Sequence, residues 1–223
     1  MHTVIAIDGP SGAGKSTVAK LLSEKLGIEY IDTGAMYRAA ALYLLGAGID
    51  IHDSEALNAA LGEMSIDFSD GRTMLNGEDI SALIRTPEVT AFASESSALA
   101  LVREKLVALQ RRMGAEKSVV LDGRDIGTNV FPHTKFKYFL TASPEVRARR
   151  RADEMEERGE DPDFDEVLAA INKRDLSDMT RELNPLVQAA DAVLIVTDDM
   201  SAEDAATLIA SSVGDELAAN VKY

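Results

Sequence analysis

The sequence contains no cysteine, no tryptophan and no apolar run near the roughly 20 residues that a membrane-spanning helix needs. Without cysteine the chain forms neither disulfides nor thiolate metal sites, which fits a reducing compartment, and we expect a cytoplasmic protein without a membrane partner. The first apolar stretch begins at Val4, so we expect no signal peptide ahead of it. Apolar residues still make up 46% of the 223 residues, enough for the core of one domain.

Basic residues are scarce relative to acidic ones. The chain has 23 lysines and arginines against 38 aspartates and glutamates, a formal net charge of −15. A surface this acidic repels nucleic acid, so we expect no nucleic-acid partner, and we expect a monomer. Anionic substrates then need a local cluster of arginines. The three histidines, His2, His52 and His133, lie outside every motif described below, and we interpret them as structural or surface residues.

A phosphate-binding pattern follows the first apolar run. This run ends at Asp8, and G-x-x-x-x-G-K-S follows immediately, with an amphipathic helical pattern after it. Glycines let the backbone curl so that successive N–H groups face an anion, and the N-terminus of the helix adds positive charge. Lys15 would reach the β- and γ-phosphates, and the Ser16 hydroxyl would ligate Mg²⁺. The residues expected to bind ATP here are Gly9, Pro10, Ser11, Gly12, Ala13, Gly14, Lys15, Ser16 and Thr17.

Short apolar runs alternate with helical patterns along the rest of the chain. The runs are nearly continuous, which is typical of parallel strands buried on both faces. We therefore predict an α/β fold with a doubly wound five-stranded parallel sheet. The predicted strands are 4–8, 28–31, 118–122, 135–140 and 192–196, and the predicted helices are 16–26, 35–45, 94–113, 144–158 and 165–179.

Two segments interrupt this alternation. Residues 64–80 indicate a small antiparallel excursion with Asp70 and Gly71 in its turn. Residues 152–164 are dense in charge and contain a glycine and a proline. We find no internal repeat and no low-complexity tract.

Polar residues follow two of the predicted strands, at the edge where open α/β sheets bind ligands. The second strand leads into Thr33 and Arg38. The third ends at Asp122, a usual place for the carboxylate that holds the water shell of a metal, and continues into Arg124 and Asp125 on a glycine-flanked loop. Each signal has an ordinary alternative, since Arg38 can be a surface arginine and Asp122 a structural strand residue.

Arginines are concentrated in the last third of the chain. Arg147, Arg150 and Arg151 share one helical face through their i+3 and i+4 spacing. The alternative is a solvated helix with salt bridges to nearby glutamates, which we favour for Arg149.

A second group of charges combines two arginines with an acid. Arg174, Asp178 and Arg181 stand at i, i+4 and i+7, so one predicted helical face presents cation, anion and cation. Two arginines directed at one pocket suit the bidentate recognition of phosphates. Residues 172–175 also match N-K-x-D, the guanine-reading signature of GTPases. They continue a helical pattern instead of following a buried strand, so we interpret this match as coincidence.

Together these motifs resemble those of bacterial cytidylate kinases, in the nucleoside monophosphate kinase group. The phosphate loop indicates only the superfamily, whereas residues 122–125 together with Arg174, Asp178 and Arg181 are much more specific. The resemblance covers most of the chain and implies a single P-loop kinase domain over residues 1–223. Its parts would be a core of 1–61 and 93–223, a small inserted monophosphate-binding subdomain at about 62–92, and a helical lid at about 152–164.

The resemblance implies reversible transfer of the γ-phosphoryl group of ATP, with Mg²⁺, to CMP or dCMP in pyrimidine metabolism. The acceptor oxygen belongs to an anionic phosphate, so no general base is needed, and Arg124 would keep Asp125 ionised. The implied roles are catalysis for Lys15, Arg124, Arg174 and Arg181; binding of the monophosphate or the transferring group for Thr33, Arg38, Arg124, Arg174 and Arg181; the cytosine edge for Ser94, Arg103 and Asp125; the ribose for Asp178; closure over ATP for Arg151 and Arg158; and the metal for Ser16 and, through water, Asp122.

One departure concerns the cytosine site. Members of the family have a proline shortly before the arginine that corresponds to Arg103, and this chain has none there. Nine residues of continuous helix turn through about 900°, which places Ser94 and Arg103 on opposite faces. Either the helix breaks without a proline or only one of the two residues reaches the base.

Two other functions match part of the pattern. A P-loop kinase of a small hydroxyl acceptor would need a base near that acceptor and fewer arginines. A nucleotide-dependent switch protein would hydrolyse GTP without an acceptor, and the position of residues 172–175 argues against it.

Overall fold

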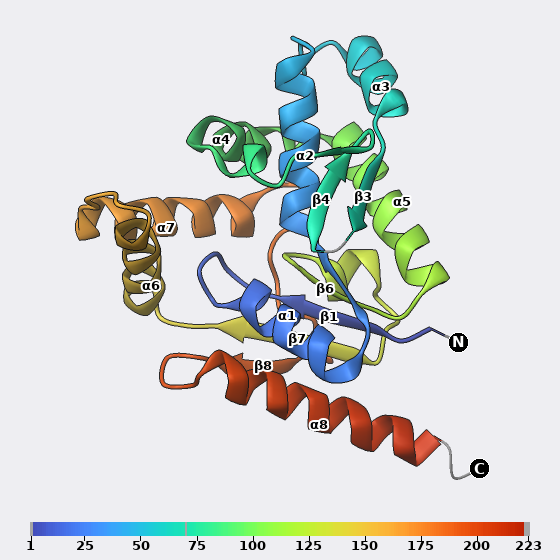
Figure 1. Ribbon diagram of the computed structural model, residues 1–223, viewed down its shortest axis with the longest axis vertical. Helices are drawn as coiled ribbons and strands as arrows, with labels where there is room; N and C mark the ends of the chain where they lie inside the picture. The colour runs from blue at the N-terminus through green and yellow to red at the C-terminus, as the bar shows by residue number, and fades with distance from the viewer. Residues whose placement is uncertain (1, 70, 221–223) are drawn as a thin grey trace. The chain divides into compact units, whose positions relative to one another are not determined.

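The computed structural model describes residues 2–69 and 71–220 (Figure 1). The chain divides into two compact units, one formed by Met1–Tyr30 with Glu116–Tyr223 and the other by Ile31–Ala115. Strand β2 and helix α5 each continue across a boundary between them. The elements are β1 (Val4–Asp8), α1 (Lys15–Leu26), β2 (Glu29–Asp32), α2 (Thr33–Gly46), α3 (Ser54–Glu63), β3 (Ile66–Ser69), β4 (Arg72–Leu75), β5 (Glu78–Asp79), η1 (Leu83–Arg85), α4 (Pro87–Ser96), α5 (Ala100–Glu116), β6 (Val119–Gly123), η2 (Ile126–Val130), β7 (Phe136–Thr141), α6 (Pro144–Glu157), α7 (Phe164–Thr180), β8 (Val193–Val196) and α8 (Ala202–Asn220).

The first unit is built on the five-stranded sheet, whose strand order is β2-β6-β1-β7-β8. Strand β1 pairs in parallel with β6 and β7, and β7 pairs in parallel with β8. The predicted α/β sheet is therefore confirmed, and each predicted strand agrees with the structure to within one residue at either end. Asp8 lies opposite Gly123 in the register. The loops that follow β1 and β6 consequently begin side by side at the carboxyl edge of the sheet.

Helices α1 and α8 pack against the central strands (Figure 1). The contact buries Val18 and Leu22 of α1 and Ile209 of α8 against Ile5 and Leu140 of the sheet. Burial of such aliphatic side chains, at about 1.5–3 kcal/mol each, holds the sheet and its loops in place.

Strand β8 differs from the prediction of strands buried on both faces. It is an edge strand, and the side chains of Val193, Leu194 and Val196 are about half-exposed. Ile195 alone of its four residues is buried. The apolar run at residues 192–196 correctly predicted a strand, but it did not predict that this strand lies at the edge of the sheet.

The second unit contains the three-stranded antiparallel sheet β3-β4-β5. Ser69 lies opposite Arg72 in this sheet, as the predicted excursion requires, and Gly71 has a φ of 74°. Asp70, which we placed in this turn, lies outside the described residues. Separately, α2 packs against α4 through Ala41 and Val89.

The prediction of one helix over 94–113 is wrong. Helix α4 ends at Ser96 and α5 begins at Ala100, with turn hydrogen bonds from Ala98 N to Glu95 O and from Leu99 N to Ser96 O, both 3.1 Å. The first of the two alternatives is therefore confirmed: the helix breaks without a proline.

Helices α3 and α8 were not predicted, although their start signals are present. The Asp53 carboxylate caps α3 by accepting from Glu55 N and Ala56 N, and the Ser201 hydroxyl accepts from Asp204 N at the start of α8. Within the described ranges, no helix combines the length and apolar character that crossing a membrane requires.

Candidate active site

The loop between β1 and α1 has the curled backbone that the glycine pattern predicts. Gly9 has a φ of +150°, and a Cβ there would lie 1.9 Å from the carbonyl oxygen of Leu140, so only glycine fits. Gly14 has a φ of 82° and stands immediately before α1. The Lys15 side chain is 5% exposed, and its Nζ donates a 2.7 Å hydrogen bond to the carbonyl oxygen of Pro10.

Two oxygen groups that could hold a divalent cation lie together at the start of α1. The Ser16 hydroxyl donates to Asp122 Oδ2 at 2.8 Å, and the Tyr30 hydroxyl donates to Asp122 Oδ1 at 2.9 Å. Hydroxyl and carboxylate oxygens are the hard ligands that Mg²⁺ prefers, so the pair fits that ion. The structure thus brings together the two predicted metal-associated residues, while no sequence signal pointed to Tyr30.

Burial controls the charges beside the loop. Desolvation, reinforced by the positive charge of Arg124, lowers the pKa of Lys15 to about 7, against the opposing pull of Asp122, Asp8 and Asp178. Burial also raises the pKa of Asp8 to about 6, although backbone N–H donors stabilise its charged form. Both groups therefore titrate near neutral pH.

Asp8 connects the two loops at the sheet edge. Its carboxylate accepts from Ile126 N at 2.8 Å and from Gly127 N at 2.7 Å. These amides begin the short π-helix η2, which directly follows Arg124 and Asp125, and such turns occur frequently at functional sites. From the sequence we interpreted Asp8 only as the end of a strand, yet it anchors the loop that carries two predicted site residues.

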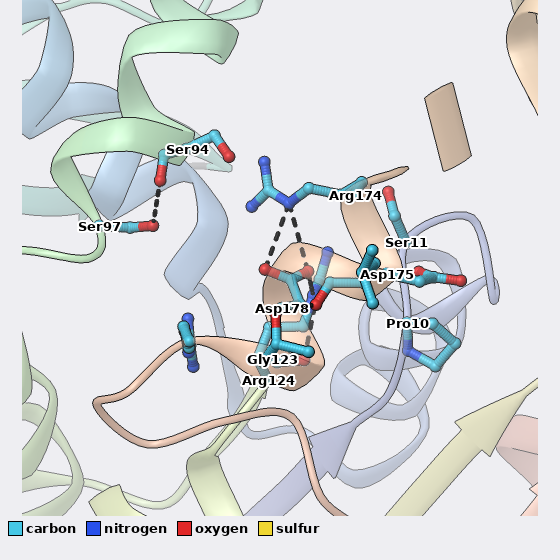
Figure 2. Close-up of polar contacts among 12 residues, drawn as sticks. Pro10, Ser11, Ser94, Ser97, Gly123, Arg124, Arg174, Asp175 and Asp178 are labelled. Carbon is cyan, nitrogen blue, oxygen red and sulfur yellow. Dashed lines mark hydrogen bonds and ion pairs between the residues drawn. The ribbon is translucent and has the colours of Figure 1, made fainter. Parts of the chain in front are cut away.

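Arg124 and Arg174 meet at Asp178 (Figure 2). Arg124 Nε donates to Asp178 Oδ2 at 2.8 Å, and Arg174 Nε donates to Oδ1 at 3.3 Å and to Oδ2 at 3.2 Å. Burial alone would raise the pKa of Asp178, but the charges and hydrogen bonds of the two arginines outweigh it and hold the pKa below its usual value. Arg124 thus binds the carboxylate of Asp178, a pairing that the sequence did not predict, and its expected influence on Asp125 stays a prediction.

Arg181 lies outside the helical face to which we assigned it. Helix α7 ends at Thr180, and Arg181 has extended backbone angles (φ −60°, ψ 141°). Its Nε donates to the carbonyl of Asn184 at 2.7 Å, and its Nη2 donates to Asp125 Oδ1 at 3.1 Å. The prediction of a shared helical face is wrong for Arg181, because α7 ends one residue before it. Arg181 nevertheless contacts Asp125, another predicted site residue.

The charged segment predicted as a lid begins in the C-terminal half of α6 and ends at the start of α7. Arg151 pairs with Glu154 at 3.0 Å and Arg158 pairs with Glu160 at 2.8 Å, and all four side chains are exposed. Arg149, for which we favoured a solvated position with salt bridges to nearby glutamates, is exposed, and its guanidinium lies 4.6 Å from the ring centroid of Phe164. The two predicted ATP-binding arginines thus bind acids of their own segment.

The N-K-x-D match lies inside α7, which confirms that it does not follow a strand. Asp175, its last residue, pairs with Arg147 at 2.7 Å. Arg147 is 3% exposed, so the alternative of a solvated arginine does not hold at this position. Neither residue was assigned a role from the sequence.

In the second unit, the start of α2 positions Thr33 and Arg38. The Asp32 carboxylate caps the helix by accepting from Ala35 N at 2.7 Å, and it also accepts from Arg38 Nη2 at 3.2 Å. Thr33 is buried. The arginine of this predicted site is therefore oriented by the residue that starts its helix.

Between α4 and α5, Ser97 makes hydrogen bonds to both Ser94 and Arg103. The Ser97 hydroxyl donates to the Ser94 carbonyl at 2.8 Å (Figure 2), and the Ser97 carbonyl accepts from Arg103 Nη1 at 3.4 Å. Arg103 is buried and its guanidinium lies 5.8 Å from the ring centroid of Tyr37. The opposite-face objection therefore does not apply.

Comparisons with known proteins give a consistent result. The family model described as "Cytidylate kinase" matches residues 5–214. Proteins named cytidylate kinase are 48% identical in Caldicellulosiruptor bescii over 90% of each chain, and 46% identical in Fervidobacterium nodosum over 92% of this chain and 93% of that one.

Two solved structures share the fold. One, from Eubacterium ventriosum, has a TM-score of 0.54 at 15% identity and covers 96% of this chain and 99% of its own. Another, from Thermus thermophilus, has a TM-score of 0.52 at 22% identity and covers 97% of this chain and 98% of its own. With a family model that spans nearly the whole chain and relatives of such identity, this chain belongs to the cytidylate kinase family.

Proposed function

We propose that the protein reversibly transfers the γ-phosphoryl group of ATP to CMP or dCMP, giving ADP and CDP or dCDP. The observation that carries the proposal is the combination, in one unit, of a phosphate loop with a buried Lys15 and a pair of arginines oriented by Asp178. The names of the relatives support the acceptor. Pyrimidine metabolism and a cytoplasmic location follow from that assignment.

The proposed chemistry depends on charge and position. The attacking oxygen belongs to a phosphate that is already anionic, so the protein needs no base to activate it. Lys15 would follow the transferring group, while Arg124, Arg174 and Arg181 would neutralise charge as it develops. Because Asp178 and Asp125 already orient these arginines, little reorganisation would accompany the transfer.

Mg²⁺ would be held by the Ser16 hydroxyl and, through water, by Asp122. When bound, the ion would neutralise charge on the β- and γ-phosphate oxygens. Tyr30 would fix the orientation of the Asp122 carboxylate through its hydrogen bond. The other glycine-loop residues, from Gly9 to Thr17, would supply backbone N–H groups to the phosphates.

We also propose which residues would hold the acceptor. We assign the monophosphate to Thr33 and Arg38, and the ribose to Asp178. The cytosine edge is assigned to Ser94, Arg103 and Asp125.

The lid arginines Arg151 and Arg158 would close over ATP by exchanging their exposed acidic partners for phosphate oxygens. Exposed ion pairs contribute about 0–1 kcal/mol to stability, so breaking them would cost little free energy. We propose a monomer that uses neither nucleic acid nor membrane as a partner.

The direct test measures ADP formation from ATP with each of CMP, dCMP, UMP and shikimate, and phosphate release from GTP alone. We expect rapid turnover with CMP and dCMP. Turnover of shikimate with none of CMP would indicate a hydroxyl-acceptor kinase. GTP hydrolysis without an acceptor would indicate a switch protein, against which the helical placement of residues 172–175 already argues.

A further inference from the structure

Arg147 is buried although it lies in the most basic run of the chain. Its Nε donates to the carbonyl of Ala142 at 2.9 Å and its Nη1 donates to the carbonyl of Ser11 at 3.0 Å. Its Nη2 pairs with Asp175 Oδ2 at 2.7 Å. One guanidinium therefore contacts the end of β7, the phosphate loop and helix α7, and Figure 2 shows two of its partners, Ser11 and Asp175.

The phosphate loop packs directly against this arginine. A Cβ on Gly12 would lie 3.1 Å from Arg147 Cβ and 3.3 Å from its carbonyl oxygen, so the missing side chain of Gly12 makes room for α6. Glycine is therefore required at this position for two reasons: it permits the close contact with Arg147, and it permits the left-handed backbone conformation at φ +76°.

Donors from the protein side hold the carbonyl groups of the loop. Pro10 O accepts from Lys15, Ser11 O accepts from Arg147, and Ala13 O accepts from the Thr197 hydroxyl at 3.3 Å. A peptide whose carbonyl is fixed on one side presents its neighbouring N–H groups on the other. Arg147 thus helps to set the orientation of the amides that would face phosphate.

Asp175 ties the same arginine to the helix of the catalytic cluster. It follows Arg174 directly and precedes Asp178 by one turn of α7. Asp175 is 8% exposed, and within residues 2–69 and 71–220 its Oδ1 has no hydrogen-bond partner. The carboxylate is therefore committed to Arg147 and not to a wider network.

We propose that Arg147 and Asp175 are a positioning pair, which holds the phosphate loop and the Arg174–Asp178 turn of α7 in the relative placement that phosphoryl transfer requires. Neither residue touches the reacting atoms. The inference rests on the proposed phosphotransferase function.

Buried ion pairs allow stability and placement to be separated. Removing one partner leaves an uncompensated buried charge, whereas replacing both by apolar residues of similar volume is often neutral or stabilising. A pair with a purely structural role should therefore be replaceable without loss of activity.

The test compares Arg147→Met, Asp175→Leu and the double variant, with thermal unfolding midpoints and with kcat and KM for ATP and CMP. Each single variant should lower the midpoint, and the double variant should recover most of it. We expect kcat of the double variant to fall about 100-fold, because a displacement of about 1 Å has that effect on catalysis. A double variant that recovers both stability and wild-type kcat would overturn the proposal.

Tyr138→Phe is the matched control. It removes a buried hydroxyl whose partner is Ser212 of α8, away from the phosphate loop. It should lower stability and leave kcat unchanged. Asp175→Asn keeps the volume and one acceptor oxygen, so it should fold even if the double variant does not, with kcat reduced about tenfold by loss of the charged contact. An unchanged kcat in Asp175→Asn would also overturn the proposal.

Calorimetric titration with ATP separates this inference from the function on which it rests. If the unmodified protein fails to use CMP, the proposed acceptor is wrong. The pair still predicts at least about tenfold weaker ATP binding in the double variant, because the loop amides lose their orientation. Unchanged ATP affinity would count against the pair whatever the acceptor.

Discussion

The two units of the chain differ in the hydrogen bonding of their buried polar side chains. In the first, Lys15 binds a loop carbonyl and Asp178 binds two arginines. In the second, Arg38 Nε, Ser96 Oγ and both polar side-chain atoms of Gln110 are buried and have no hydrogen-bond partner among the described residues. The first unit also contains such an atom, Asp175 Oδ1, but the charges beside its phosphate loop have hydrogen-bond partners that orient them.

This difference indicates how stability is divided. An unsatisfied buried polar group costs about 1–3 kcal/mol, while an oriented charge in a dry site lowers the reorganisation that accompanies catalysis. We therefore expect changes at the oriented charges of the first unit to act mainly on rate, and a change at an unpaired buried side chain of the second unit, such as Gln110, to act mainly on stability.

Lys15→Ala should have the largest effect. If Lys15 follows the transferring phosphoryl group as proposed, its removal should lower kcat about 10³-fold, or about 4 kcal/mol of barrier, with the fold retained. Steady-state kinetics and circular dichroism measure the two quantities. Lys20→Ala, an exposed change on the same helix, is the control and should be silent. Near-normal turnover of a folded Lys15→Ala protein would show that Lys15 is not catalytic.

Asp125→Ala should come next, through base choice. An ionised carboxylate only accepts hydrogen bonds, so it favours the amino group of cytosine over the carbonyl of uracil. The ratio of kcat/KM for CMP to that for UMP should fall about 100-fold, the value of an unpaired buried polar contact of about 3 kcal/mol.

The alternative is that Asp125 serves only to orient Arg181, its partner at 3.1 Å. In that case both monophosphates would lose activity by the same factor and the ratio would not change. Arg181→Lys keeps the charge but not the fork of donors, and serves as the comparison variant.

The pKa of Lys15 predicts a proton linked to nucleotide binding. Burial and Arg124 lower this pKa to about 7, so the lysine is mostly neutral at pH 8, and a bound triphosphate would favour the charged form. Binding of ATP at pH 8 should therefore take up about one proton. Calorimetry in buffers of different ionisation enthalpy measures the uptake, which Lys15→Arg should abolish; buffer-independent heats for the unmodified protein would contradict the assignment.

The lowered pKa of Lys15 also determines how the stability of the nucleotide-free protein changes with pH. Between pH 7 and the ordinary lysine value of 10.5, the unfolded chain holds a proton at Lys15 that the folded chain has released. The contribution of Lys15 to the free energy of unfolding therefore rises with pH across that window.

Gln110→Met should have the smallest effect, and it tests the second unit. Gln110 is 1% exposed, and its two polar atoms have no hydrogen-bond partner among the described residues. An apolar side chain of similar shape should raise the free energy of unfolding by about 1 kcal/mol and leave kcat unchanged. Urea unfolding measures this, with exposed Gln188→Met as control; a loss of stability would show that the comparison between the units is wrong.

Features that depend on local sequence were predictable. The strands of the main sheet are short apolar runs, and the phosphate loop is fixed by glycines whose side chains would collide with neighbours such as Leu140. The Ser16–Asp122 contact was predictable in outline because Asp122 lies at the carboxyl end of β6 and Ser16 follows the neighbouring parallel strand β1. Helices α3 and α8 could also have been found from the caps at Asp53 and Ser201.

Features that depend on tertiary contacts were not. The break after Ser96 has no proline or glycine to signal it, and one of its carbonyls is bound by the buried Arg103. Arg147 is indistinguishable by local pattern from the exposed arginines around it, because its burial depends on partners in the phosphate loop and α7. Arg181 left its predicted face because α7 ends at Thr180.

The exposed edge strand β8 (Val193–Val196) has a consequence for handling the protein in solution. A half-exposed apolar edge can template strand pairing between molecules, and flanking charges are a usual protection against it. Asp191 and Asp198 flank the strand, and hydrogen bonds from Lys137 and Ser143, respectively, lower their pKa values. These two carboxylates keep their charge further into acid than ordinary ones, so they protect the edge at the pH, near the pI of 4.6, where the rest of the surface loses its net repulsion.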